Sequence, residues 1–333
     1  LPHRSKKLEY SCFAERSYTG GIGILVAKHM VAWERESAMA TATLQHKPPK
    51  DMMSLALQIT DGCTHGKCRF CDIYEGVPFT ALPREEVIAD IEELAKRAMS
   101  HERRVYFTGG NPYALPTDQL LEIMDEIEKR IPSVNSYGGF CRIMDIARKS
   151  DEELAALAAR GVNDIAIGAE SGYDPALEFM EKGCTAADIV EQGGRLHDAG
   201  IEFTFFYLAG LAGAGKGQEN AIASAKAFSA AAPKTILIVT ITPTKTWRLH
   251  QDVLEGRWEP EGEREMAEEI RTFIAHLDCT CHINCSHDSD IIQFEGMVPK
   301  DQENMLKLLD ARIPKMNEAS ARKRRQYMHG ACF

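Results

Sequence analysis

The sequence lacks any apolar run of the length that crosses a membrane, about 18 residues. The longest candidate, residues 20–26, is followed closely by Lys28 and His29. Residues 1–10 also lack the apolar region of a signal peptide. These two absences predict a protein without a membrane partner.

An excess of basic charge is missing as well. The chain has 49 Asp and Glu residues against 39 Lys and Arg residues, a formal net charge of −10. Nucleic-acid binding depends on basic side chains that neutralise phosphates, so this balance argues against a nucleic-acid partner. We interpret the one basic run, residues 322–325, as a solvated helix end and not as a binding patch.

What is present fits a globular protein with a large core. With 333 residues, of which 44% are hydrophobic and 26% charged, the chain has the size of a single α/β barrel. Its ten cysteines, without a secretory segment, indicate reduced thiols and metal ligands, not a disulfide framework. If these thiols bind an iron–sulfur cluster, the expected compartment is the cytoplasm.

From residue 54 onward, short β-branched or aromatic runs alternate with amphipathic helical patterns. This rhythm predicts repeated βα units and a parallel sheet, with the functional site at the carboxyl ends of the strands. A doubly wound sheet and a partly closed barrel both fit. The expected strands are residues 55–60, 104–108, 133–141, 164–168, 202–208 and 235–241; the expected helices are residues 84–99, 117–130, 151–160, 186–199, 218–231, 263–277 and 301–312.

The cysteine spacing CX4CX2C directly after the first expected strand is the main chemical signal. It comprises Cys63, Cys68 and Cys71. A structural zinc site normally uses four protein ligands, whereas a four-iron cluster on three thiolates leaves one iron open to a small molecule. The alternative is a zinc knuckle that borrows a fourth ligand such as His65, or three buried thiols without a metal.

Two further strand ends carry polar or glycine-rich segments. Gly109-Gly110-Asn111 would let a ligand approach the backbone, or would form an ordinary turn. Glu170-Ser171 could hold a ribose diol, or could be a helix cap beside a solvated carboxylate.

Two segments suggest competing sites. Residues 210–217 match a phosphate-binding loop except at Gly217, where Mg²⁺ needs a Ser or Thr hydroxyl, so we interpret them as a strand–helix loop. Cys279, Cys281 and Cys285 form a candidate second metal site. Their spacing matches no common cluster motif, and structural thiols are the alternative.

Taken together, these segments resemble the radical S-adenosylmethionine (radical SAM) superfamily, and within it the Fe–S oxidoreductases related to methylthiotransferases and oxygen-independent coproporphyrinogen oxidases. The resemblance runs from about residue 48 to about residue 309. It departs from the common CX3CX2C spacing by one residue, and Asn111 replaces the usual acid. It implies an α/β fold, a partial (βα)6 TIM-type barrel of parallel strands with N- and C-terminal extensions. The expected domains are residues 1–47, 48–260 and 261–333.

The same resemblance implies the cofactors and their contacts. Three thiolates would hold a [4Fe–4S] cluster and S-adenosylmethionine (SAM) would chelate the open iron. The implied metal ligands are Cys63, Cys68 and Cys71, and the implied SAM contacts are Phe70, Gly109, Gly110, Asn111, Glu170, Ser171 and Pro243. No further catalytic residue is assigned.

The expected activity is reductive cleavage of SAM to a 5′-deoxyadenosyl radical that abstracts hydrogen from a small-molecule or metabolite substrate. A ferredoxin or flavodoxin is the expected electron donor. The alternatives are a zinc- or cluster-binding interaction protein without catalysis or, within the superfamily, a porphyrin-type oxidase or methylthiolating enzyme.

Overall fold

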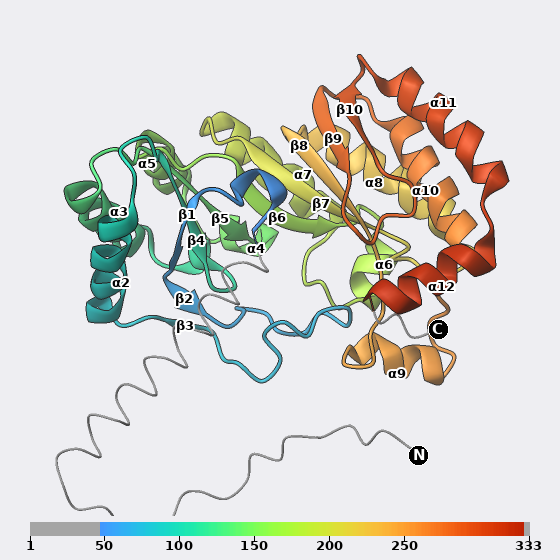
Figure 1. Ribbon diagram of the computed structural model, residues 1–333, viewed down its shortest axis with the longest axis horizontal. Coiled ribbons are helices and arrows are strands. Elements are labelled where there is room, and N and C mark those ends of the chain that lie inside the picture. Colours follow the sequence, from blue (N-terminus) through green and yellow to red (C-terminus); the bar gives the residue numbers. More distant parts are fainter. Residues whose placement is uncertain (1–46, 330–333) are drawn as a thin grey trace, which may run out of the picture. The chain divides into compact units, whose positions relative to one another are not determined.

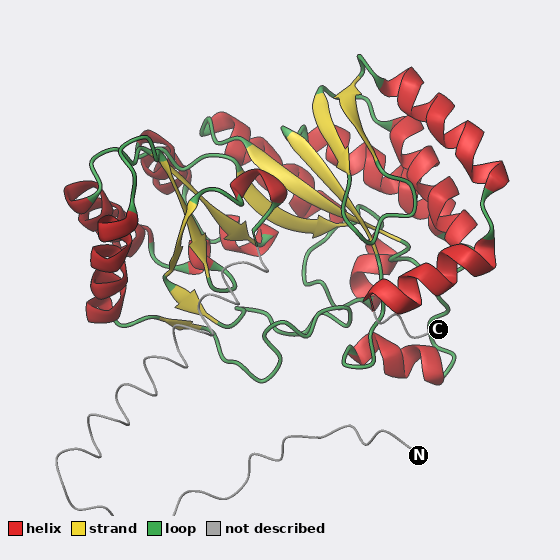
Figure 2. Cartoon of the chain, in the orientation of Figure 1, coloured by secondary structure: helices red, strands yellow, loops and turns green. Residues whose placement is uncertain are grey.

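A computed structural model describes residues 47–329, in which eight strands form one open sheet (Figures 1 and 2). Of the predicted N-terminal domain, residues 1–47, all but residue 47 lie outside the described residues. In spatial order the strands are β1 (Leu55–Gln58), β4 (Arg104–Thr108), β5 (Ser136–Cys141), β6 (Ile165–Glu170), β7 (Phe203–Ala209), β8 (Thr235–Thr240), β9 (Cys281–Cys285) and β10 (Phe294–Val298). β2 (Thr60–Asp61) and β3 (Thr80–Ala81) pair separately.

The strand order distinguishes the two architectures that the sequence left open. From β1 to β9 each strand pairs in parallel with the next, and only the final pair, β9 with β10, is antiparallel. A doubly wound sheet reverses its order at a switch point, whereas a barrel-type sheet proceeds in one direction. The predicted partial barrel of parallel strands is therefore confirmed. Its sheet is not closed, since β1 and β10 are its two edges.

The helices follow the expected amphipathic patterns. In α3 the buried residues Leu120, Ile123, Met124 and Ile127 recur at helical spacing. Each predicted strand and helix in the described range is found within a few residues of its expected bounds. The helices are α2 (Arg84–Arg97), α3 (Thr117–Arg130), α4 (Ile143–Ile146), α5 (Asp151–Ala159), α6 (Asp174–Phe179), α7 (Ala186–Asp198), α8 (Gly217–Ala231), α9 (Arg248–Leu254), α10 (Glu263–His276), α11 (Gln302–Arg312) and α12 (Glu318–His329), with short 3-10 turns at Pro49–Asp51, Pro112–Ala114 and Ile313–Lys315. None of these helices is both long and apolar enough to span a membrane.

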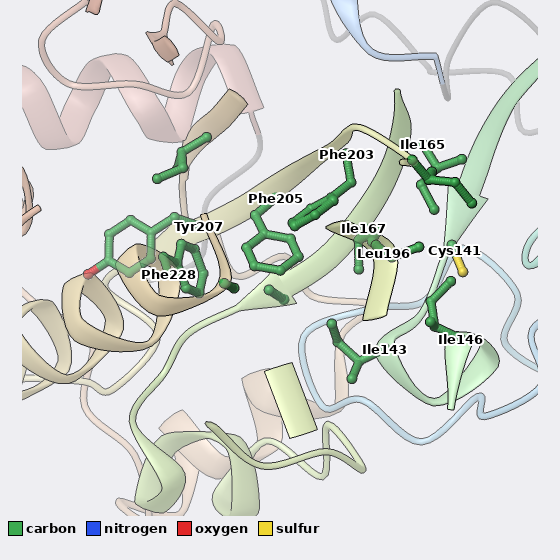
Figure 3. Close-up of a cluster of buried hydrophobic side chains, with 14 of the residues drawn as sticks. Cys141, Ile143, Ile146, Ile165, Ile167, Leu196, Phe203, Phe205, Tyr207 and Phe228 are labelled. Atoms are coloured by element: carbon green, nitrogen blue, oxygen red, sulfur yellow. The ribbon is translucent and has the colours of Figure 1, made fainter. Parts of the chain in front are cut away.

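The core lies between the central strands and the helices that cover them (Figure 3). Because alternate residues of a strand share one face, Phe203, Phe205 and Tyr207 of β7 all point to the same side. Phe205 lies edge-on to Phe228 of α8, with ring centroids 5.0 Å apart. Tyr207 stacks on Phe273 of α10 at 4.0 Å. This aromatic packing fixes β7 against α8 and α10.

The C-terminal part continues the same sheet. β9 adds in parallel to β8, and α10 packs against α8. The boundary predicted at residues 260/261 stays a prediction.

In α12, three members of the basic run are exposed but Arg325 is buried. Its Nη1 donates to the carbonyl of Ile241 at 3.0 Å and its Nε lies 3.2 Å from Glu263. The interpretation of residues 322–325 as wholly solvated is thus wrong for Arg325, which anchors α12 beyond β8.

Candidate functional site

The three clustered cysteines lie in the loop between β2 and β3, at the carboxyl end of β1. All three are free thiols. Cys63 and Cys68 are half-buried and Cys71 is exposed. The loop therefore presents its thiols at the edge of the sheet where the sequence rhythm predicted a site.

Gly109 and Gly110, directly after β4, pack against the beginning of this cysteine loop. A Cβ on Gly109 would lie 1.8 Å from the carbonyl oxygen of Thr60, and one on Gly110 would lie 1.7 Å from that of Gly62. Both glycines have positive φ, +95° and +65°. The N–H of Gly110 also donates to Oη of Tyr74 at 2.6 Å. Only glycine permits this backbone-to-backbone contact.

Asn111 holds the same loop through its side chain. Its Oδ1 accepts from the backbone N–H of Thr64 at 2.9 Å, and Asn111 is buried. The Thr64 hydroxyl in turn lies 3.2 Å from Oδ1 of Asp145. The predicted SAM contact of Asn111 stays a prediction. The contact that the structure gives this side chain is with the residue next to Cys63.

Glu170 ends β6 in the left-handed region, with φ +68°, beside a β-bulge. Its carboxylate pairs with the buried Lys182 at 3.0 Å. A Cβ on Gly168 would lie 2.4 Å from Oε1 of Glu170, so this glycine makes room for the pair. The Lys182 ammonium also lies 5.7 Å from the centroid of Phe70. A non-glycine residue with positive φ costs conformational energy, and such residues concentrate at functional sites.

Ser171, the neighbour of Glu170, faces the opposite way. Its side chain is fully buried, and its hydroxyl donates to Oδ1 of Asn220 on α8 at 2.5 Å. The same oxygen accepts from the N–H of Tyr173 at 2.9 Å. The two residues predicted as a ribose-binding pair thus have separate environments, and only Glu170 connects to the cysteine loop. Pro243, the last predicted SAM contact, lies buried just beyond β8.

The electrostatics around the thiols are set by burial and two cations. Burial raises the pKa of Cys68, and the charges of Lys182 and Arg142 oppose that rise. Burial alone would lower the pKa of Lys182, but the Glu170 carboxylate and nearby thiols hold it above its ordinary value. The positive charge of Lys182 therefore favours the thiolate form of Cys68, the form that binds metal, against the effect of burial.

The donor set fits an iron–sulfur cluster better than a zinc knuckle. Nε2 of His65 is hydrogen-bonded to the carbonyl of Glu181, so its polar contact is with the backbone and not with the thiols. Three thiols without a histidine match the ligation of a four-iron cluster in which one iron has no protein ligand. Within residues 47–329 no three His, Cys, Asp or Glu side chains are already gathered as a metal site, and this holds for the cysteine loop too. Cluster binding would draw its thiols together.

The second candidate site lies largely in the core. Cys281 and Cys285 occupy the buried face of β9 and belong to the main hydrophobic cluster. His282 points to the other face, 3.6 Å from Glu295. Metal binding by Cys279, Cys281 and Cys285 stays a prediction, and the packing of two of them agrees with the structural alternative.

The glycine-rich segment before α8 faces carboxylates. The N–H of Gly215 donates to Oε1 of Glu265 at 2.5 Å. A Cβ on Gly217 would lie 2.9 Å from Oε2 of Glu261. Two carboxyl groups at the start of α8 occupy the position that an anion would take, so the strand–helix interpretation of residues 210–217 agrees with the structure.

Several residues of the site carry no sequence signal. Lys182 lies between α6 and α7, and neither it nor Tyr74 nor Arg142 belongs to a sequence motif. Beside the cysteine loop lies a cavity of about 570 Å³, lined in part by His65, Lys67 and Cys184. The sequence does not indicate that Lys182 pairs with Glu170, because the fold brings the two residues together.

Comparison with known proteins agrees with this geometry. Residues 57–213 match the sequence model of the radical SAM superfamily. The chain carries a radical SAM domain. The matched range begins in β1 and ends beyond β7, so it includes the cysteine loop, the Gly109–Gly110 pair and Glu170. The predicted superfamily is therefore confirmed, and the predicted cluster and SAM agree with it.

Two curated relatives are similar over part of this domain. The heme chaperone HemW of Bacillus subtilis is 24% identical over 145 residues, 42% of this chain and 38% of the relative. HemW of Lactococcus lactis is 27% identical over 141 residues, 42% and 36% respectively. The alignments thus span less than half of either relative.

Among solved structures, methylornithine synthase (PylB) aligns at 16% identity with a TM-score of 0.48, covering 81% of this chain and 86% of that one. The radical SAM methyltransferase TsrM from Kitasatospora setae, with cobalamin and a [4Fe–4S] cluster bound, aligns at 17% identity and a TM-score of 0.49, covering 61% and 37%.

Proposed function

We propose that this protein is a radical SAM enzyme in which Cys63, Cys68 and Cys71 hold a [4Fe–4S] cluster. The observation that carries the proposal is the loop of three free thiols, packed against Gly109 and Gly110 at the carboxyl edge of a radical SAM domain. When bound, such a cluster supplies the electron that cleaves SAM to methionine and a 5′-deoxyadenosyl radical. A ferredoxin or flavodoxin is the proposed donor, and a small molecule the proposed substrate.

The chain's own residues would hold and orient the cofactors. Lys182 supplies positive charge beside Cys68, which stabilises bound thiolates. Glu170, held in place by Lys182, offers carboxylate oxygens to a ribose diol. The half-buried backbone after β4 would offer its remaining polar groups to an amine or carboxylate. Such preorganised contacts would align the bond to be broken with the electron donor.

Anaerobic reconstitution tests the proposal. Iron and sulfide should approach about four each per chain, and reduction in the presence of SAM should yield 5′-deoxyadenosine. A Cys68→Ala variant should lose both. Zinc in place of iron, with no deoxyadenosine, would contradict the enzyme and favour a zinc-binding interaction protein.

The SAM contacts have a separate test in two neighbouring residues. Glu170→Gln should weaken SAM binding in a calorimetric titration, whereas Ser171→Ala should lower stability while SAM affinity stays the same, because its hydroxyl is buried against α8. Equal losses of SAM affinity in both variants would restore the two residues as a ribose-binding pair.

A second candidate is heme or porphyrin binding without SAM cleavage, and the matches to two heme chaperones favour it. Titration of the reconstituted protein with heme, followed by its Soret band, measures this directly. Saturable heme binding without deoxyadenosine formation would select this candidate. Deoxyadenosine formation without heme binding would select the enzyme.

A further inference from the structure

A network of ion pairs joins the cysteine loop to α9, outside the residues that match the superfamily. Arg69 lies between Cys68 and Phe70, within the CX2C half of the motif. Its Nη1 donates to both carboxylate oxygens of Asp252 on α9, each at 3.0 Å. Asp252 is fully buried, and a buried carboxylate destabilises the fold unless cations are paired with it.

Backbone hydrogen bonds support the same contact. The N–H of Arg69 donates to the carbonyl of Met180 at 3.1 Å, and its carbonyl accepts from the N–H of Leu249 at 2.8 Å. Three residues further along the loop, Asp72 accepts from Nε1 of Trp247 at 3.2 Å. The segment that contains Cys68 and Cys71 is therefore fixed from the α9 side, as Gly110 and Asn111 fix the Cys63 end.

The charges of this network nearly balance. Arg257 also pairs with Asp252, at 2.7 Å, and Arg69 makes a second ion pair with Glu181 at 2.7 Å. Glu181 in turn contacts Arg248 at the start of α9. Without the Asp252 carboxylate, Arg69 and Arg257 would lose the anion that they share.

We propose that Asp252 is a positioning residue for the cluster. Its contact with Arg69 fixes the spacing of Cys68 and Cys71, and its negative charge offsets two guanidinium groups beside the cluster loop. This inference rests on the proposed function, because it concerns the same cluster.

Two consequences can be separated. Loss of the two-oxygen contact would let the loop move, so the cluster would release iron more readily. Loss of the negative charge would leave uncompensated positive charge near the cluster, which stabilises its reduced form and raises its reduction potential. Residues that orient metal ligands typically change metal affinity by about 10–100-fold.

Three variants of the reconstituted full-length protein distinguish these effects. In Asp252→Asn we expect iron release to a chelator to be about 10-fold faster, together with a more positive midpoint potential. In Arg69→Lys the charge is kept but the planar fork is lost, so iron release should accelerate while the potential stays near that of the wild type. Glu255→Gln removes an acid from the same region that, among the described residues, pairs with Arg257 alone, and both readouts should match the wild type.

The outcomes are decisive for each hypothesis. If Asp252→Asn releases iron at the rate of Glu255→Gln, the positioning proposal is overturned and the proposed function stands. If the wild type holds no cluster, the proposed function fails and this inference with it. If circular dichroism shows that Asp252→Asn does not fold, Arg69→Lys decides, and wild-type iron release in that variant overturns the proposal.

Discussion

Two glycine-rich segments follow strands of the same sheet, yet their surroundings differ. The pair Gly109–Gly110 after β4 touches the backbone of the cysteine loop, with carbonyl oxygens of Thr60 and Gly62 against the glycine backbone. The segment 210–217 after β7 is surrounded by a buried network in which Glu269 accepts from Tyr207, Asn220 and the N–H of Gly210.

The difference between these two segments indicates which strand ends can bind a cofactor. After β4 the glycines bring together segments that carry thiols, and those thiols stay partly accessible. After β7 the glycine backbone instead contacts a buried carboxylate, Glu269, whose two oxygens accept from Tyr207, Asn220 and the N–H of Gly210. Glycine content alone does not separate these cases, because both segments contain positive-φ glycines.

The largest expected effect comes from filling the contact after β4. Gly110→Ala would place a Cβ 1.7 Å from the Gly62 carbonyl, in a left-handed backbone conformation. We expect a loss of about 3 kcal/mol or more in the free energy of unfolding, and loss of bound iron. Urea denaturation and iron analysis measure both.

The matched control is Gly215→Ala, which has the same sign of φ but nothing within 4 Å of the added Cβ. It should lose only about 1 kcal/mol and keep its iron. If both alanine variants behave alike, the close approach after β4 is not what distinguishes the two segments.

Breaking the buried network should reduce stability without affecting the cluster. Both oxygens of Glu269 accept hydrogen bonds, one from the N–H of Gly210 and the other from Tyr207 and Asn220. In Glu269→Gln the amide NH₂ replaces one of these oxygens, so a donor then faces a donor. The expected loss is about 2–3 kcal/mol, with iron content unchanged. Glu268→Gln, exposed on the same helix, serves as the control and should change by less than about 0.5 kcal/mol. Lower iron content in Glu269→Gln would mean that the two regions are coupled.

Removing the side chain of Asn111 should loosen the cysteine loop. Asn111→Ala leaves the N–H of Thr64 without its acceptor, and we expect a loss of about 2 kcal/mol and weaker iron binding. Asn111→Asp keeps an acceptor oxygen and should lose less. An alanine variant with wild-type iron affinity but weaker SAM binding would instead support the SAM contact that the sequence predicted.

A pH dependence in the β7 region is the last expected effect, and within a single pH unit it is the smallest. Burial and the charge of Glu269 raise the pKa of Glu261 far above its ordinary value. Above the unfolded-state pKa of about 4.3, only the folded state keeps this proton, so stability falls as pH rises toward the folded pKa. Glu261→Gln has no such proton. As the pH rises, the free energy of unfolding of this variant relative to that of the wild type should therefore increase by about 1 kcal/mol per pH unit.

Thermal unfolding of both proteins at about pH 6 and about pH 8 measures this change. Glu268→Gln again serves as the control. A Glu261→Gln variant whose stability relative to the wild type is the same at both pH values would show that Glu261 does not retain its proton in the folded state.

Much of the fold could be predicted from sequence periodicity. α3 and β4 have the predicted bounds, because their buried residues alternate at helical or strand spacing. The strand order could not be predicted, since the repeat of βα units is the same in a doubly wound sheet and in a barrel. Charge alone predicts that residues 322–325 are solvated, whereas the burial of Arg325 against Glu263 depends on a residue 62 positions away.

The sequence by itself determined which chemistry the chain can offer, because three thiols at CX4CX2C spacing after a strand are a local pattern. Only the tertiary structure decided which other residues surround the loop that carries these thiols. Lys182 meets Glu170 and Phe70, and Asp252 meets Arg69 across 183 residues of sequence. It also separated Ser171 from Glu170 by turning adjacent side chains toward different neighbours. The physical reason is that ligand type is a property of a short segment, whereas burial and charge pairing arise when distant segments pack together.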